Sequence, residues 1–266
     1  MKKSDFLLRN IKLAPLQIAI VRSEEAFIMA KIKMVKPILD IGCSDGIFGE
    51  VLFNGEKGAI DVGIDIDEIA LKLSGRKKVY KKVLIADAKK LPFPSDSFST
   101  VMSNQSLEHI KNVDCVFNEV ARVIKKGGRF IFLVPTIYLD DYWLTSAVFK
   151  KVGLKSFANT MHSFRNKIFK HYNLWSIKKW KKLLEKNGFL LKKYQYVGRK
   201  DLYFISEIFW IFRIPTYFLS RILRRNMIFP RKYSIILAKI IAKRININEY
   251  NIPLKGPTMF IIAQKK

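Results

Sequence analysis

An acidic glycine loop is the stretch of this chain whose residue types and spacing could do chemistry. Ile38 to Gly49 (I-L-D-I-G-C-S-D-G-I-F-G) passes from an apolar run through two glycines into a second apolar run. The pattern predicts a buried strand, a tight turn and a helix, and such a turn is where a doubly wound α/β sheet binds its ligand. Gly42 and Gly46 have no Cβ, so the backbone can turn sharply and a ligand can approach it.

The charge of this loop favours a cationic ligand over a phosphate. A dinucleotide fingerprint would need G-x-G-x-x-G, and Ser44 occupies the first glycine position of that register. Asp45 would also repel the phosphates. S-adenosylmethionine has a sulfonium, an ammonium and no phosphate, so a loop flanked by Asp40 and Asp45 suits it better. An ordinary turn between a strand and a helix remains the alternative.

A second carboxylate follows at the spacing at which a ribose would be held. Ala59 to Asp67 (A-I-D-V-G-I-D-I-D) predicts a strand that ends in Asp65, 23 residues after Gly42. An acidic residue about 20 residues past the glycine loop can accept hydrogen bonds from both ribose hydroxyls. Asp65 could instead be a solvated strand end, or a cap for a helix that begins near Asp67.

Five sequence blocks between Ile38 and Pro135 occur in a characteristic order. They are D-I-G-C-S-D-G, G-I-D-I-D, A-D-A-K-K-L-P-F-P, F-S-T-V-M-S-N-Q-S-L-E-H-I and E-V-A-R-V-I-K-K-G-G-R-F-I-F. In this combination the stretch resembles the class I S-adenosylmethionine-dependent methyltransferases. The resemblance is to the group that includes the ubiquinone- and menaquinone-type enzymes and many small-molecule and lipid methyltransferases.

The resemblance implies a role for each matching position. The methionine end of the cofactor would be lined by Asp40, Gly42, Cys43 and Gly46. The ribose and adenine would be held and covered by Asp65 and Ile66, and the adenine amine would meet Asp87 and the backbone of Ala88. The sulfonium and the substrate would face Asn104 and Gln105. Ser44 departs from the second glycine that is common in the family, although a small residue still fits there.

A histidine follows the predicted fourth strand. If the methyl acceptor is a hydroxyl, a general base is useful, and His109 lies at the correct end of that strand beside Glu108. His109 could instead be structural, and His162 and His171 are rival candidates for the base.

The net charge of +27 is concentrated in one part of the chain. Residues 37–135 carry 14 basic and 13 acidic side chains, whereas residues 136–266 carry 27 and 6. A ligand that is attracted by positive charge would therefore bind the C-terminal half. A lysine-rich genome would explain part of the excess of basic residues. Two cysteines, Cys43 and Cys115, provide no disulfide framework and no metal-ligand spacing, which favours a cytoplasmic location and predicts no metal.

The predicted fold is α/β: a Rossmann-like, doubly wound, seven-stranded sheet whose last strand is antiparallel. We expect a helical leader or lid in residues 1–36, a cofactor-binding core in residues 37–135, substrate-side loops with a helix and the sixth strand in residues 136–200, an insertion in residues 201–257 and the last strand in residues 258–266. Within these parts we expect a turn at Gly127-Gly128 and a basic, polar loop from Thr160 to Trp175.

The insertion is strongly apolar and edged by basic residues. Thirteen of the 18 residues from Leu202 to Leu219 are apolar, Arg221, Arg224 and Arg225 follow, and Tyr233 to Ala242 is a second amphipathic run. Such helices are typical of peripheral binding to an anionic membrane surface. Glu207, Arg213 and Pro215 disfavour a transmembrane span. Covering the substrate cleft, or packing on a partner, is the alternative role.

These observations predict a methyltransferase that transfers a methyl group from S-adenosylmethionine to a small-molecule, lipid or lipid-linked acceptor at the membrane surface. An RNA methyltransferase is the main alternative, because the basic C-terminal half with its interleaved aromatic residues could bind nucleic acid. A second alternative is a non-catalytic, membrane-associated scaffold that kept the fold. The intact set of Asp40, Asp65 and Asp87 argues against the scaffold.

Overall fold

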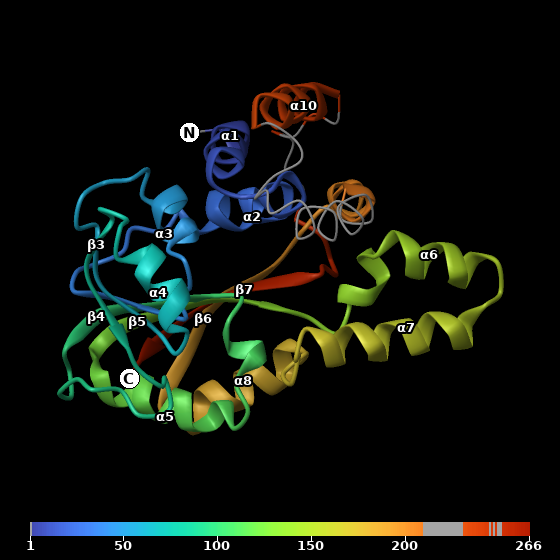
Figure 1. Ribbon diagram of the computed structural model, residues 1–266. Helices are drawn as coiled ribbons and strands as arrows, with labels where there is room; N and C mark the ends of the chain where they lie inside the picture. The colour runs from blue at the N-terminus through green and yellow to red at the C-terminus, as the bar shows by residue number, and fades with distance from the viewer. Residues whose placement is uncertain (1, 210–230, 245, 247, 249–251) are drawn as a thin grey trace.

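A seven-stranded sheet organises the chain. The computed structural model describes residues 2–209, 231–244, 246, 248 and 252–266 (Figure 1). The strands are β1 (Ile38–Ile41), β2 (Ile60–Asp65), β3 (Tyr80–Ile85), β4 (Phe98–Asn104), β5 (Ile124–Pro135), β6 (Phe189–Val197) and β7 (Thr258–Lys265). Their order in the sheet is β3-β2-β1-β4-β5-β7-β6, and β7 runs antiparallel to both of its neighbours. The predicted fold class is therefore confirmed.

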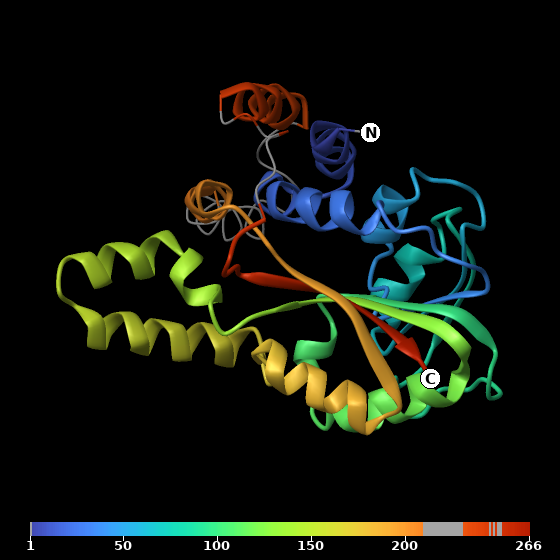
Figure 2. The same ribbon diagram turned by 180° about the vertical axis from the view of Figure 1, so that it is seen from behind.

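Helices cover both faces of the sheet. They are α1 (Lys3–Leu13), α2 (Leu16–Met29), α3 (Ile47–Leu52), α4 (Glu68–Ser74), α5 (Val113–Val123), α6 (Leu144–Lys151), α7 (Lys155–Ile168), α8 (Ile177–Lys186) and α10 (Arg231–Arg244), with short 3-10 turns η1 (Leu107–His109) and η2 (Leu139–Tyr142). The helices α1 to α4 lie on one side of the sheet and α5 and α8 on the other (Figures 1 and 2).

Alternating strand residues divide the core into two layers. In β5, Phe130 and Phe132 face α5 and α8, whereas Ile131 and Leu133 belong to the layer shared with α2 and α3. Phe117 of α5 stacks on the fully buried Trp180 of α8, with 5.8 Å between the ring centroids. Successive side chains of a strand point to opposite faces, so strands covered on both sides are apolar at nearly every position.

The N-terminal region, which was expected to be helical, forms two helices. The structure forms α1 before α2, and Lys3 of α1 is buried in an ion pair with Glu24 of α2, with 2.7 Å between nitrogen and oxygen. The helix α10 packs on this pair, and its Ala238 and Ile241 are buried with Leu7 and Ile20. The predicted second amphipathic run is therefore helical, and part of its apolar face is already covered within the chain.

The rest of the insertion lies largely outside the described residues. Residues 200–209 are helical, and Leu202 and Glu207 are buried. Residues 210–219, and the three arginines that follow them, fall outside the described part of the chain. Among the helices that the structure describes, none combines the length and the apolar character that a bilayer crossing requires.

Two local predictions were wrong. The expected loop from Thr160 to Trp175 is helical as far as Ile168, because α7 continues with Phe164 and Ile168 spaced at one helical turn. The expected turn at Gly127-Gly128 lies inside the continuous strand β5, where the pairing with β4 shifts register between Phe98 and Thr100. A glycine pair can therefore mark a β-bulge as well as a turn.

Candidate active site

A cavity of about 570 Å³ lies at the carboxyl ends of the parallel strands, between the sheet and the α1–α2 pair. All the predicted site residues line it except Gly46. The group that the structure brings together is Asp40, Gly42, Cys43, Asp65, Ile66, Asp87, Ala88, Asn104, Gln105 and His109. The rival histidines His162 and His171 are not among its lining residues.

The glycine loop forms the floor of this cavity. The backbone amides of Gly42 and Cys43 both donate to the carbonyl of Ile64, at 2.9 and 3.0 Å, which ties the loop to the end of β2. Gly42 has φ = +73°, and a Cβ there would lie 2.3 Å from Oγ of Ser106. Glycine is therefore required at position 42 by both conformation and space. Ser44 also adopts a positive φ of 49°, so the serine takes the conformation that a glycine would adopt more easily.

Asp40 is buried at the end of β1 and accepts a 2.8 Å hydrogen bond from the hydroxyl of Tyr80. Burial raises the pKa of Asp40 to about 7, against the opposing effect of the Tyr80 hydrogen bond, and the nearby charge of Asp65 adds to the rise. The carboxyl group therefore changes charge close to neutral pH. Tyr80 belongs to β3, and its contact with β1 could not be predicted from the spacing of the motifs.

Asp65 and Asp87 are more exposed and are oriented by backbone amides. Asp65 accepts from the amide of Ser44 at 2.8 Å and from the amide of Asp67 at 3.0 Å. Asp87 accepts from the amide of Lys89 at 2.9 Å. Amides that donate to a carboxylate fix its direction. The helix cap considered for Asp65 is instead provided by Asp67, which accepts from Ile69 and Ala70.

The helix α2 supplies a second wall that sequence reasoning missed. Glu25 is buried and accepts from Gln105 at 2.7 Å and from Asn104 at 3.2 Å. Burial raises the pKa of Glu25. Arg22, one turn earlier in α2, lines the cavity. The only signal for this wall was the run Ser23-Glu24-Glu25, which interrupts an otherwise apolar helix.

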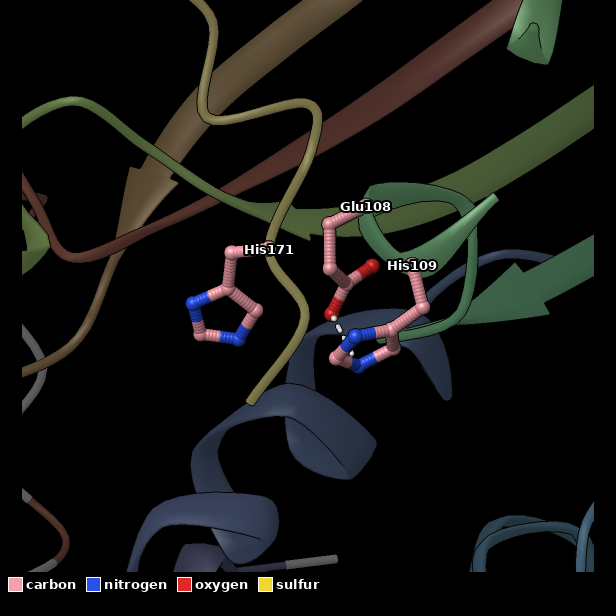
Figure 3. Close-up of side chains that lie close together, drawn as sticks. All are labelled: Glu108, His109 and His171. Atoms are coloured by element: carbon pink, nitrogen blue, oxygen red, sulfur yellow. Dashed lines mark ion pairs between the residues drawn. The ribbon is translucent and has the colours of Figure 1, made fainter. Parts of the chain in front are cut away.

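Glu108, His109 and His171 form a polar cluster (Figure 3), and His109 of this cluster lines the cavity. Nε2 of His109 lies 3.5 Å from the carboxylate of Glu108, and its Nδ1 lies 3.4 Å from the carbonyl of Lys170. Nδ1 of His171 lies 3.3 Å from the side-chain oxygen of Asn166. Burial raises the pKa of Glu108 to about 8 and lowers the pKa of both imidazoles, to about 4 in His171.

The ligand atoms of this cluster lie within 4.8 Å of one another, which is close enough to consider a metal ion. One feature disfavours a cation: the positive charge of Arg22 acts on both Glu108 and His109. A neighbouring positive charge repels a divalent ion. We interpret the cluster as neutral polar groups that position His109.

His162 lies in a different environment. Its Nδ1 is 3.2 Å from the carboxylate of Asp140, which also accepts from Arg165 at 2.6 Å and pairs with Lys150 at 3.1 Å. Burial alone would raise the pKa of Asp140, but hydrogen bonds from Ser146, Lys150 and Arg165 hold it below its usual value. This cluster joins η2, α6 and α7. It therefore has a structural role, and the structure gives no support to His162 as the base.

Known proteins resemble the chain in the same region. Residues 39–132 match a family model described as a methyltransferase domain. A sterol 4-C-methyltransferase of Caenorhabditis elegans is 34% identical over 110 residues, which cover 39% of this chain and 32% of that protein. A demethylmenaquinone methyltransferase of Symbiobacterium thermophilum is 33% identical over 106 residues, which cover 36% and 41%. The matched region is thus less than half of each of these relatives.

Similarity to a solved structure extends over nearly the whole chain. A structure described as a S-adenosylmethionine-dependent methyltransferase, possibly a histamine N-methyltransferase, from Thermotoga maritima superposes with a TM-score of 0.58 and 15% identity, covering 94% of this chain and 92% of that one. At this identity the likeness concerns the fold alone. The family match agrees with the five sequence blocks. Through residues 39–132 the chain belongs to the class I S-adenosylmethionine-dependent methyltransferases.

Proposed function

We propose that this chain is an active S-adenosylmethionine-dependent methyltransferase whose acceptor is a small molecule of lipid or lipid-linked character. The observation that supports the activity best is the convergence of Asp40, Asp65 and Asp87 on one cavity. These carboxylates end three different strands, and the glycine loop between them leaves room for a ligand against the backbone. When bound, the cofactor supplies a methyl group on a positively charged sulfur.

The polar groups of the cavity fit the parts of this cofactor. Asp40 and the loop from Gly42 to Ser44 would hold the methionine end, and Asp65 would accept from both ribose hydroxyls. Asp87 and the backbone of Ala88 would meet the adenine. Ile66 lines the cavity with its side chain 75% exposed, so the flat adenine ring could pack on it. Gly46 supports the loop from behind, since a Cβ there would lie 2.9 Å from Ser74.

Arg22 completes this set. The amino-acid part of the cofactor carries a carboxylate as well as an ammonium, and the glycine loop from Gly42 to Asp45 provides only acidic or neutral side chains to it. Arg22 brings a guanidinium to the same cavity from α2, and a guanidinium can bind a carboxylate with two parallel hydrogen bonds. We therefore assign the carboxylate to Arg22.

The acceptor would enter between the end of β4 and α2. Asn104 and Gln105 lie at the end of β4, and Glu25 holds both amide groups in fixed orientations. Fixed polar groups around a dry cavity contribute by orienting the reactants and by excluding water. His109 also lines the cavity, and its lowered pKa keeps the imidazole neutral and able to accept a proton from a hydroxyl acceptor at pH 7.

The acceptor class is inferred from the relatives and from the apolar character of the chain. The names of two relatives specify a sterol and a demethylmenaquinone, both of which are lipids. The insertion in residues 201–257 contributes further apolar and basic residues. We propose a lipid or lipid-linked acceptor reached at a membrane surface, and we retain RNA as the second candidate because residues 136–266 carry 27 basic and 6 acidic side chains.

Calorimetry with S-adenosylmethionine tests the cofactor half of the proposal. Asp65→Ala should weaken binding at least about tenfold, because a ribose held by two charge-assisted hydrogen bonds loses both. Asp96→Asn is a matched control, because Asp96 is an exposed carboxylate that pairs with Lys265 outside the cavity. Equal affinity of wild type and Asp65→Ala would overturn the assignment of Asp65. If the wild type shows no measurable binding of S-adenosylmethionine, the proposed methyltransferase activity would be overturned and the alternative of a non-catalytic scaffold favoured.

Transfer of an isotopically labelled methyl group tests the acceptor half. The wild-type protein is incubated with methyl-labelled cofactor and separate lipid, water-soluble and RNA extracts, and the label in each is measured by mass spectrometry. We expect label in the lipid extract and none with Asp65→Ala. Label confined to RNA would replace the lipid proposal by the RNA methyltransferase.

A further inference from the structure

The helices α6 and α7 form an antiparallel hairpin that extends away from the rest of the molecule (Figures 1 and 2). The turn between them is Val152, Gly153 and Leu154. All seven residues from Lys151 to Phe157 are exposed, and we call this segment the hairpin tip. Its apolar side chains are 63% exposed in Val152, 53% in Leu154 and 49% in Phe157. An apolar cluster of this kind at the end of a projection indicates a binding surface.

The sequence of the hairpin itself carries basic residues and no acidic ones. From Tyr142 to Leu184 the chain has ten lysine and arginine residues and no aspartate or glutamate. Lys151 and Lys155 lie within the tip itself and flank Val152 and Leu154. Apolar side chains bordered by lysines suit the interface of an anionic bilayer, because the apolar groups enter the acyl boundary while the ammonium groups remain at the phosphates.

The hairpin is held firmly at its base and is free at its tip. The base contains the Asp140 cluster, in which Arg165 of α7 and Ser146 of α6 both contact one carboxylate. Near the tip, the rings of Phe149 and Phe157 pack edge to face with centroids 4.6 Å apart. These contacts fix the two helices against each other, so the exposed apolar groups are presented on a formed structure.

Both ends of the hairpin meet the edge of the sheet that carries the cavity. The chain reaches α6 from the carboxyl end of β5 through η2. After α7 it returns to Tyr172 and Asn173, whose amides donate to the carbonyl of Glu108 at 2.8 and 3.2 Å. Glu108 precedes His109, which lines the cavity. The base of the hairpin therefore lies beside the part of the cavity to which we assign the acceptor.

We propose that the hairpin tip docks the protein on an anionic lipid surface and directs the cavity toward it. This inference rests on the proposed function for the identity of the acceptor, but the docking itself does not need the cofactor. It also differs from the expectation from the sequence, which assigned membrane binding to the insertion in residues 201–257. The apolar face of α10 is partly buried against α1 and α2, whereas the tip, which the sequence analysis treated as substrate-side structure, is exposed.

Flotation with vesicles of phosphatidylcholine, with and without roughly 30% phosphatidylglycerol, tests the docking. Two variants of the full chain separate its parts: Val152→Ser with Leu154→Ser removes apolar groups, and Lys151→Glu with Lys155→Glu reverses the charge. Leu73→Ser with Leu190→Ser is the matched apolar control, since both leucines are about as exposed and lie on other elements. Lys57→Glu with Lys78→Glu is the matched charge control.

We expect the wild type and both controls to bind the anionic vesicles, and each tip variant to bind them at least about tenfold more weakly. Full retention of vesicle binding by both tip variants, or no binding by the wild type, would overturn the proposal. If instead the wild type sediments as a dimer and the serine variant as a monomer with unchanged vesicle binding, the tip contacts a second copy of the chain. If only the glutamate variant is affected, and it loses binding to RNA while its binding to vesicles is retained, the tip binds nucleic acid.

The same variants separate this inference from the proposed function. Their affinity for S-adenosylmethionine should equal that of the wild type, because the tip residues do not line the cavity. Loss of vesicle binding with intact cofactor affinity supports docking by the tip. Intact vesicle binding in a wild-type protein without cofactor affinity would overturn the enzyme assignment alone.

Discussion

The hydroxyl of Tyr80 on β3 reaches across β2 to donate a 2.8 Å hydrogen bond to Asp40 on β1. Gly63 is the residue of β2 that pairs with Asp40, and a Cβ at Gly63 would lie 2.9 Å from the ring of Tyr80. The glycine therefore leaves the space through which the tyrosine passes. The buried carboxylate at the end of β1 thus depends on a residue two strands away.

Tyr80→Phe should weaken binding of S-adenosylmethionine at pH 7 by roughly fivefold to tenfold. The lost hydrogen bond favours ionised Asp40, so its removal raises the pKa of Asp40 above about 7 and leaves less carboxylate at neutral pH. The affinity of the variant should recover toward the wild-type value as the pH rises to about 8.5. Calorimetry across this range checks the shift, and Tyr194→Phe, which changes an exposed tyrosine of β6, is the control. A constant ratio of affinities at all pH values would contradict the role of Tyr80.

Gly42→Ala should destabilise the fold by at least about 2 kcal/mol more than Gly153→Ala. Both glycines have positive φ, +73° and +85°, so both substitutions impose a similar backbone cost. At Gly42 the added methyl group meets Oγ of Ser106 at 2.3 Å, whereas at Gly153 no atom of the described residues lies within 4 Å. Urea unfolding of the two variants separates the steric contribution at Gly42 from the backbone cost that both substitutions share. Equal free energies of unfolding would show that the loop moves freely away from Ser106.

Glu108→Gln should change the pH dependence of stability. The folded chain keeps the Glu108 proton up to about pH 8, whereas the unfolded chain releases it near pH ~4.3. Between these values the folded state binds more protons, so the free energy of unfolding of the wild type falls as the pH rises. Glutamine carries no ionisable proton, so the variant should gain at least about 1 kcal/mol relative to the wild type between pH 5 and pH 8, a range of about 3 units. Glu56→Gln, at an exposed glutamate, is the control, and parallel curves for Glu108→Gln and wild type would contradict the assignment.

Asp140→Asn should loosen the α6–α7 hairpin without affecting the cavity. The substitution removes the negative charge that Arg165, Lys150 and His162 share, and it leaves three cationic or polar groups without their common partner. Amide hydrogen exchange in residues 144–168 should become faster, because the free energy of local opening should fall by about 2 kcal/mol. Exchange in the sheet should stay unchanged. Asp141→Asn, which changes an exposed carboxylate next in sequence, is the control. Unchanged exchange in the hairpin would show that apolar contacts alone hold it.

The order of the motifs determined the sheet and most of the cavity. Short strands that carry apolar residues and have Asp40, Asp65 or Asn104 at or near their carboxyl ends predict a parallel sheet with its polar groups at one edge. The structure brings these residues together, and only Gly46 among the predicted set lies behind the loop. Local spacing suffices here because each residue sits at a fixed offset from its own strand.

Only the tertiary structure decided the contacts that cross between distant elements. Glu25 meets Gln105 across 80 positions of sequence, Tyr80 meets Asp40 across 40, and His171 reaches the Glu108–His109 pair from a segment that the sequence predicted as a loop. The hairpin tip likewise has an ordinary amphipathic composition, and its exposure follows from where α6 leaves the sheet. Periodicity and motif spacing describe one element at a time. Burial, pKa and exposure depend on which elements pack together, so these properties appear only when the chain is folded.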